Sequence, residues 1–143
     1  MTIGRLIASR DPAAVVTCDA EARLSDAVDC LAAHGIGAVP VMRHGLVAGI
    51  LSERDVIHRL HEEGAGCLDR QVSEIMTAPA ITVDRATKVA DALQLMTERR
   101  VRHLPVVEHG RMLGFVSIGD LVKDRIDEAT RDAEALRQYI TTA

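Results

Sequence analysis

The sequence contains almost no aromatic side chains. Its 143 residues include no Trp, one Tyr and one Phe, although 48% of them are hydrophobic. The core therefore has to be built from aliphatic side chains, chiefly those of Val, Ile, Leu, Ala and Met. A chain of this length forms one or at most two small domains and buries enough surface to fold without disulfides or metals. The content of charged residues, 27%, together with this apolar content excludes a disordered chain.

Long apolar runs are absent as well. Arg, Asp, Glu or Gly interrupts each apolar stretch well before the roughly 18–20 residues that a membrane span needs. Residues 1–10 lack the apolar segment of a secretory signal. Cys18, Cys30 and Cys67 form no C-x-x-C pair, and an odd number of cysteines is ordinary in a reducing compartment. We therefore expect a soluble, cytoplasmic protein with no membrane partner, whose cysteines are small buried or half-buried thiols.

Neither the charge nor the motifs indicate a nucleic-acid-binding protein or an enzyme. The 17 basic and 21 acidic residues give a net charge of −4, whereas a nucleic-acid-binding domain typically carries an excess of basic residues. No G-x-S-x-G, P-loop or H-E-x-x-H motif occurs, so we predict no enzyme and no catalytic residues. Cys18 would act as a nucleophile only beside a base. His58, His61 and Glu62 have the spacing of metal ligands on one helix face, but solvated helix residues explain it equally, and we predict no metal.

The most informative feature is an internal repeat. Residues 16–56 align with residues 81–121 without a gap, at a shift of 65 positions. Apolar positions agree throughout, and so do many polar and glycine positions. Among the identical pairs are Thr17/Thr82, Asp19/Asp84, Asp26/Asp91, Ala27/Ala92, Pro40/Pro105, His44/His109, Gly45/Gly110, Gly49/Gly114, Ser52/Ser117 and Asp55/Asp120. Such ordered agreement indicates a tandem duplication.

Each copy predicts the same order of elements. Short β-branched runs at residues 15–17 and 81–83 are typical of strands. Helical spacing of apolar residues predicts a helix after each run, and Thr87 is the expected N-cap of the second one. A strand that carries a proline, a tight turn, a third strand and a helix complete each copy. The ranges are 24–31, 38–41, 47–52 and 55–63 in the first copy, and 89–96, 103–107, 112–117 and 120 onward in the second.

These elements predict an α/β (α+β) fold made of two pseudo-symmetric repeats. Each repeat holds a small three-stranded sheet and two helices, which is too little to bury both faces of its sheet, so the two repeats must pack together. We place the repeats at residues 3–64 and 72–126 and a long C-terminal helix at 127–143. Residues 3–7 match residues 72–76 as the segments that lead into the repeats.

The C-terminal helix carries an apolar pattern of its own. After residue 121 the apolar residues recur at alternating spacings of four and three, as in the seam of a coiled coil. The helix either lies on its own domain or pairs with a second chain, and both interpretations stay open at this point. The seam consists of Val122, Ile126, Ala129, Ala133, Leu136 and Ile140.

Each copy ends in a serine at the end of a strand and an aspartate three residues later at the start of a helix. These pairs are Ser52 with Asp55 and Ser117 with Asp120. The serine hydroxyl and the free N–H groups of the first helical turn converge on one point, which suits a phosphate. The carboxylate can accept both hydroxyls of a ribose diol. The competing interpretation is that the serine and the aspartate merely cap the helix.

The repeat resembles the cystathionine-β-synthase (CBS) domain pair, also called the Bateman module. The similarity is carried by residues 104–107 and 114–121 in the second copy, and by residues 39–41 and 49–56 in the first. It covers residues 3–126 and implies a stand-alone regulatory module that binds a nucleotide between its repeats. In this family Asp55 and Asp120 would hold ribose, and Ser52 and Ser117 would approach phosphate.

The resemblance also implies which basic residues complete the site. The segment before Pro105 lines the nucleotide cleft in the family, so Arg102 and His103 are expected to contact phosphate. We expect Arg99 and Arg100 to form a solvated helix end, which suits the helix dipole. Arg54 is the nearby cation of the first copy. The expected result is two unequal sites, of which the Asp120 site binds a phosphorylated ligand more tightly.

The adenine slot is expected to be aliphatic, because aromatic side chains are scarce. Its expected residues are Thr82, Val83, Leu104 and Ile118, with Thr17 and Ile36 as their counterparts in the first copy. The expected ligand contains adenosine: AMP first, with ATP, ADP, NAD(H) and S-adenosylmethionine as alternatives, and no cofactor is obligatory. The module would signal energy or redox state to an unidentified effector protein and form a homodimer. The alternative is a ligand-independent scaffold for dimerisation or protein interaction.

Overall fold

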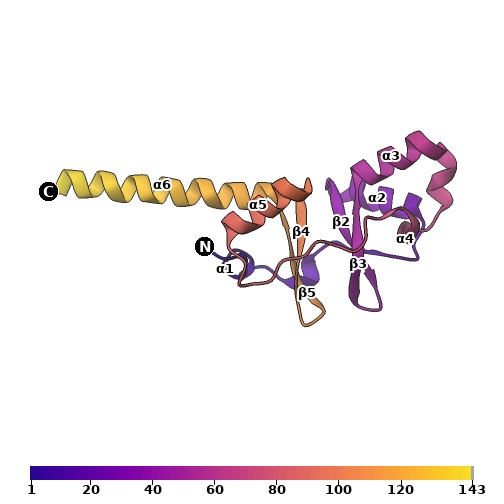
Figure 1. Cartoon of the computed structure of the whole chain (residues 1–143), viewed down its shortest axis with the longest axis horizontal. Helices are drawn as coiled ribbons and strands as arrows, with labels where there is room; N and C mark the ends of the chain where they lie inside the picture. The colour runs from indigo at the N-terminus through magenta and orange to yellow at the C-terminus, as the bar shows by residue number, and fades with distance from the viewer. Residues whose placement is uncertain (143) are drawn as a thin grey trace.

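The computed structural model describes residues 1–142, which form two small α/β units followed by a long helix (Figure 1). The first unit contains β1 (Cys18–Asp19), α2 (Leu24–His34), β2 (Ala38–Arg43), β3 (Leu46–Ser52) and α3 (Glu53–Glu63). The second contains α5 (Val89–Arg99), β4 (His103–Glu108), β5 (Arg111–Ser117) and α6 (Ile118–Thr142). The remaining elements are α1 (Ile3–Ile7), η1 (Pro12–Ala14), η2 (Ala65–Asp69) and α4 (Val72–Ile75). The predicted fold class is confirmed; position 143 of the predicted C-terminal helix lies outside the described residues.

The first strand of each repeat is shorter than predicted and begins later. β1 runs parallel to β2, and β2 pairs antiparallel with β3. The second unit has a two-stranded sheet of β4 and β5, to which Val83 adds one parallel bridge with Val106. The strand predicted at residues 15–17 is wrong, because Pro12 starts a 3₁₀ turn there and Val15 ends it. The strand predicted at residues 81–83 is reduced to that bridge.

The predicted hairpin turns are confirmed, but the predicted cap at Thr87 is wrong. His44 and Gly45 have φ of 53° and 77°, and His109 and Gly110 have φ of 51° and 76°. Two consecutive positive φ angles define the type I′ turn, whose twist matches that of the strands it joins. Helix α5 instead has Lys88 as its N-cap, since the Thr87 hydroxyl donates to Asp84 Oδ1 at 3.0 Å in the preceding loop.

Each unit has an aliphatic core, as predicted, and the units exchange their leading helices. Val72 and Ile75 of α4 are buried in the core of the first unit. Ile3 and Ile7 of α1 are buried in the core of the second unit, which follows about eighty residues later. The sequence repeats therefore interlock, because the leading segment of each one completes the core of the other.

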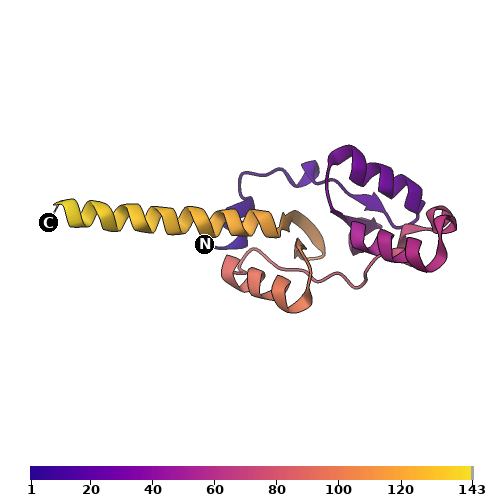
Figure 2. The ribbon, with the colours of Figure 1, turned by 90° about the horizontal axis from the view of Figure 1, so that it is seen from above.

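The two units lie side by side, and α6 leaves the second of them. Strand β3 contacts β5, and the backbone groups of Ile50 and Thr77 exchange two hydrogen bonds of 3.0 and 2.9 Å. Helix α6 extends away from both units in both views (Figures 1 and 2), and every residue from 129 to 142 is exposed. This part of the helix does not lie on its own domain. Within residues 1–142, no helix has both the length and the apolar character of a membrane span.

Candidate functional site

Two cavities lie between the units and are related by the internal repeat. The first, of about 440 Å³, is formed by the corner between β3 and α3, by residues 77–81 and by residues 99–103; we call it the Asp55 cavity. The second, of about 470 Å³, is formed by the corner between β5 and α6, by residues 10–16 and by residues 36–38; we call it the Asp120 cavity. Both volumes are in the range of small-molecule sites. Each cavity therefore combines residues from both repeats.

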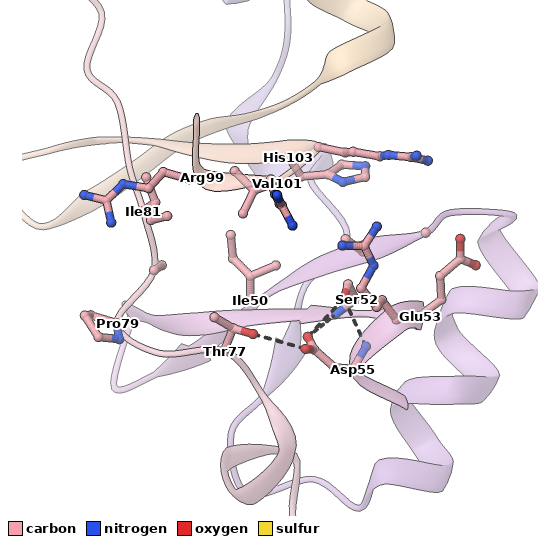
Figure 3. A pocket seen from close by; sticks show the side chains of 16 residues that line it. Ile50, Ser52, Glu53, Asp55, Thr77, Pro79, Ile81, Arg99, Val101 and His103 are labelled. Atoms are coloured by element: carbon pink, nitrogen blue, oxygen red, sulfur yellow. Dashed lines mark hydrogen bonds between the residues drawn. The ribbon is translucent and has the colours of Figure 1, made fainter. Parts of the chain in front are cut away.

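The corner of the Asp55 cavity is a capping box that also faces the cavity. The Asp55 N–H donates to Ser52 Oγ at 3.2 Å, and the Ser52 N–H and hydroxyl donate to Asp55 Oδ2 at 2.9 and 3.0 Å. The other carboxylate oxygen, Oδ1, accepts the Thr77 hydroxyl at 3.1 Å (Figure 3). Ser52 and Asp55 therefore do cap α3, as the competing interpretation predicted. The cap uses Oδ2 of the Asp55 carboxylate and leaves Oδ1 with its bond from Thr77.

The corner of the Asp120 cavity has the same cap and an additional ion pair. The Ser117 N–H donates to Asp120 Oδ2 at 2.9 Å, and the Asp120 N–H donates to Ser117 Oγ at 3.1 Å. Arg10 approaches both carboxylate oxygens at 3.3 Å. Burial raises the pKa of Asp120, but the Ser117 N–H and the Arg10 guanidinium outweigh it, so this pKa lies below its usual value. An arginine of this chain thus already engages the second carboxylate.

The two cavities differ in charge. Four arginines line the Asp55 cavity together with the carboxylates of Glu53 and Asp55. The Asp120 cavity contains Arg10 beside the carboxylates of Asp11 and Asp120. The structure thus places Arg102 with Asp55, not with Asp120, and it places Arg99 and Arg100 on the cavity wall rather than only at a solvated helix end. The four arginines are Arg54, Arg99, Arg100 and Arg102.

His103 lies on the wall shared by the two cavities. Its imidazole stacks on Phe115 with ring centroids 5.3 Å apart and lines both cavities. Burial lowers the pKa of His103, Arg102 lowers it further, and Asp120 and Glu53 act in the opposite direction. Ala38 is the equivalent residue of the first repeat and also lines both cavities. The histidine is therefore within electrostatic reach of both sites.

Several residues expected in the adenine slot line neither cavity. Val83 and Leu104 are buried in the core of the second unit, and Thr17, Thr82 and Ile118 are exposed. Of the expected slot residues, Ile36 lines the Asp120 cavity. The observed apolar walls consist of Ile50, Ala80, Ile81 and Val101 in the Asp55 cavity, and of Val15, Val16, Ile36, Leu113 and Phe115 in the Asp120 cavity.

Arg100 has a backbone conformation that suits glycine. It ends α5 with φ of 54°, where the equivalent Gly35 ends α2 with φ of 61°. A side chain in this region costs about 1–2 kcal/mol, and such strain is often retained at functional sites. We expect Arg100→Gly to raise the melting temperature by roughly 2–4 °C. Gly35→Ala is the reciprocal control and should lower it, because its surroundings are open and only the backbone conformation changes. A lower melting temperature for Arg100→Gly would contradict this account.

Cys18 has the properties of a structural thiol. Burial, with smaller contributions from Cys30 and Asp19, raises the pKa of Cys18 to about 11. The thiolate is the reactive form, so about one Cys18 in a thousand is reactive at pH 8. We expect iodoacetamide to modify Cys18 much more slowly than Cys30 at pH 8, and the Cys18 rate to rise steadily up to about pH 11. Peptide mass spectrometry measures both rates, and equal rates at pH 8 would contradict this expectation.

Of the two histidines on α3, His58 contacts a neighbouring carboxylate. His58 Nε2 lies 3.0 Å from Glu62 Oε1 on the exposed side of the helix. Across residues 1–142, no group of three or more His, Cys, Asp or Glu side chains is placed to hold a metal ion.

The protein is a tandem-repeat module: its two copies interlock, and a pair of equivalent cavities lies between them. The family model described as "CBS domain" matches it twice, over residues 7–62 and 72–127. The chain belongs to the CBS domain family, which confirms the resemblance seen in the sequence.

Comparisons with individual proteins agree with this assignment. The chain is 38% identical over 128 residues to the CBS domain-containing protein CBSX3, mitochondrial, of Arabidopsis thaliana, covering 86% of this chain and 62% of CBSX3. The crystal structure of the CBS-domain containing protein ATU1752 from Agrobacterium tumefaciens matches with a TM-score of 0.80 and 37% identity, over 87% of this chain and 99% of that one. The structure of CBSX2 in complex with AMP shares the fold, with a TM-score of 0.75 and 22% identity, over 90% and 98% of the two chains.

Proposed function

We propose that this chain is a regulatory module that binds an adenosine-containing nucleotide in the Asp55 cavity between its repeats, with AMP as the leading candidate. The observation that carries the proposal is the composition of this cavity. It brings Asp55, four arginines and an aliphatic wall together across the two units. These are the three kinds of group that a ribose, a phosphate and an adenine require.

Each part of a nucleotide has a counterpart in the Asp55 cavity. A carboxylate accepts hydrogen bonds from both ribose hydroxyls, and Asp55 Oδ1 faces the cavity with a single bond from Thr77. Arginine binds phosphate oxygens through paired N–H donors. The planar base fits between Ile50, Ile81 and Val101, which line the cavity from three different segments. CBSX2, which shares the fold, is in complex with AMP, and the CBS domain pair of protein MJ0100, which also shares the fold, is in complex with 5-methylthioadenosine and S-adenosyl-L-methionine. Both support a ligand that contains adenosine; AMP stays the first candidate because the cavity arginines suit a phosphate, and ATP, ADP, NAD(H) and S-adenosylmethionine are the alternatives.

In this proposal the Asp55 cavity, not the Asp120 cavity, is the tighter site for a phosphorylated ligand. The opposite expectation assumed that Arg102 contacts the ligand held by Asp120, and this arginine lines the Asp55 cavity instead. In the Asp120 cavity, a ligand has to compete with Arg10 for the carboxylate, because Arg10 lies 3.3 Å from both of its oxygens.

A ligand in the Asp55 cavity touches both units, so its binding free energy favours one relative arrangement of them. The module would then report the level of the nucleotide to an effector protein, and a homodimer would present two such modules together. As a nucleotide sensor of this kind, the chain would bind its ligand without converting it. The cytoplasmic location expected from the sequence stays a prediction, since the similar CBSX3 is described as mitochondrial.

A panel of nucleotides followed by thermal unfolding tests the proposal. A ligand that binds only the folded state stabilises it by RT ln(1 + [L]/Kd), about 2.7 kcal/mol at a concentration of one hundred Kd. We expect AMP to raise the melting temperature more than GMP, CMP or inorganic phosphate at equal concentrations. ADP, ATP, NAD and S-adenosylmethionine in the same panel rank the other adenosine compounds. No shift with any compound would favour the ligand-independent scaffold.

A further inference from the structure

Helix α6 carries an exposed apolar seam along its whole length. Leu121 and Asp124 are buried on the side that faces the second unit. The seam lies on a different side, and it is exposed even next to the unit, where Val122 is 43% accessible; Ile140 near the end is 67% accessible. Exposed apolar surface of this extent marks an interaction site in soluble proteins. The seam consists of Val122, Ile126, Ala129, Ala133, Leu136 and Ile140.

The protruding part of α6 gains no stability from packing on the rest of the chain. Every residue from 129 to 142 is exposed, so this stretch gains no burial from the rest of the chain (Figure 2). An isolated helix shorter than about 12–15 residues is marginal in water, and most helix stability comes from packing an apolar face. The seam supplies that face over about 27 Å, given the rise of 1.5 Å per residue.

The order of residues in the seam fits a second copy of the same helix. The spacing of four and three assigns Val122, Ala129 and Leu136 to position d of a heptad, and Ile126, Ala133 and Ile140 to position a. When two copies align in parallel and in register, each layer pairs a residue with itself, so the two small alanine layers meet small residues and the larger layers meet larger ones. The antiparallel pairing also places Ala129 against Ala133 and larger residues against larger ones, so the flanking charges decide the orientation.

The charges beside the seam select the parallel orientation. In a parallel pair, residue g of one helix faces residue e of the next heptad in its partner, which places Asp132 beside Arg137 of the other copy on both sides of the pair. The antiparallel pairing that keeps all six layers would place Lys123 beside Arg137 and Asp132 beside Asp132. Opposite charges at these positions stabilise pairing and like charges oppose it.

We propose that α6 pairs with α6 of a second copy as a parallel, in-register coiled coil through this seam. The inference rests on the homodimer part of the proposed function and names its surface, but it requires no bound nucleotide. The pairing brings two modules together at the same end of the coiled coil. None of the six seam residues lines the Asp55 or the Asp120 cavity, so both cavities remain open in the pair.

Cysteine cross-linking of the full chain tests the orientation. Ile140→Cys at position a places two thiols face to face in a parallel pair, and we expect a disulfide-linked dimer after mild oxidation. Gln138→Cys lies at position f on the outer side of the helix and is the matched control, which should cross-link at least about tenfold more slowly. The unsubstituted chain controls for its three native cysteines. Equal rates for the two variants would overturn the proposal.

Analytical ultracentrifugation tests the seam itself. We expect Leu136→Glu to raise the dimer dissociation constant at least about tenfold, because it places a charge in an apolar layer on both copies. Gln138→Glu adds the same charge on the outer side and should leave the constant unchanged. Leu136 is exposed in the single chain, so the substitution spares both cores. An unchanged constant for Leu136→Glu would overturn the proposal, and the nucleotide panel repeated on this variant tests the proposed function separately.

Discussion

Replacing Arg100 and Arg102 together by glycine is expected to weaken AMP binding about a hundredfold without unfolding the protein. Each lost charge-assisted hydrogen bond costs about 1.5–3 kcal/mol, so two contacts of this kind account for the factor. Glycine is the residue that the first repeat has at both equivalent positions, Gly35 and Gly37. Arg100→Gly moreover relieves the strained backbone at the end of α5. Isothermal titration calorimetry of the double variant measures the effect.

The control for this prediction removes the same charge elsewhere. Arg43 and Arg111 are exposed at the ends of β2 and β5 and line neither cavity. The double variant Arg43→Ala, Arg111→Ala should bind AMP as the unsubstituted chain does. If both double variants lose affinity equally, the attraction comes from the net charge of the protein and the cavity arginines have no specific role.

Asp55→Asn is expected to remove the preference for ribose over deoxyribose. A hydrogen bond from the 2′-hydroxyl to a carboxylate contributes about 1.5–3 kcal/mol, so AMP should bind the unsubstituted chain at least about tenfold more tightly than 2′-deoxy-AMP. In the variant the two affinities should approach each other, because the amide is uncharged and one of its two groups is a donor. Competition calorimetry with the two nucleotides gives the ratio.

The internal repeat supplies a matched control for the loss of the cap. Asp120→Asn disturbs the same capping box at the start of α6 that Asp55→Asn disturbs at the start of α3. If Asp55 merely caps a helix, the two variants should change the ratio equally. In our account the ratio at the tighter site falls in Asp55→Asn and persists in Asp120→Asn.

Features that depend on local pattern could be predicted from the sequence. The ungapped repeat predicted two equivalent units, and the histidine–glycine pairs predicted turns that the structure confirms at residues 44–45 and 109–110. The aliphatic core followed from the composition. These predictions succeeded because each depends on residues that lie close together in the chain or on the internal comparison.

The grouping of residues into sites could not be predicted in the same way. The sequence suggested that each serine–aspartate corner is completed by its own repeat, whereas each cavity also takes arginine and apolar residues from the other repeat. The contact of Arg10 with Asp120 was not predicted, because Arg10 lies in the segment that leads into the first repeat and is 110 positions away from Asp120 in the sequence. Thr17 and Thr82 lay within the strands predicted at residues 15–17 and 81–83, but strand pairing begins only after each threonine, at Cys18 and Val83, and both side chains are exposed.

A crystal structure of the chain grown with AMP tests the central claim most directly. We predict one AMP in the Asp55 cavity, with its ribose hydroxyls on Asp55, its phosphate among the arginines of residues 99–102 and its adenine against Ile81 and Val101. An empty Asp55 cavity at saturating AMP, or a nucleotide bound on an outer face of the units, would contradict the account.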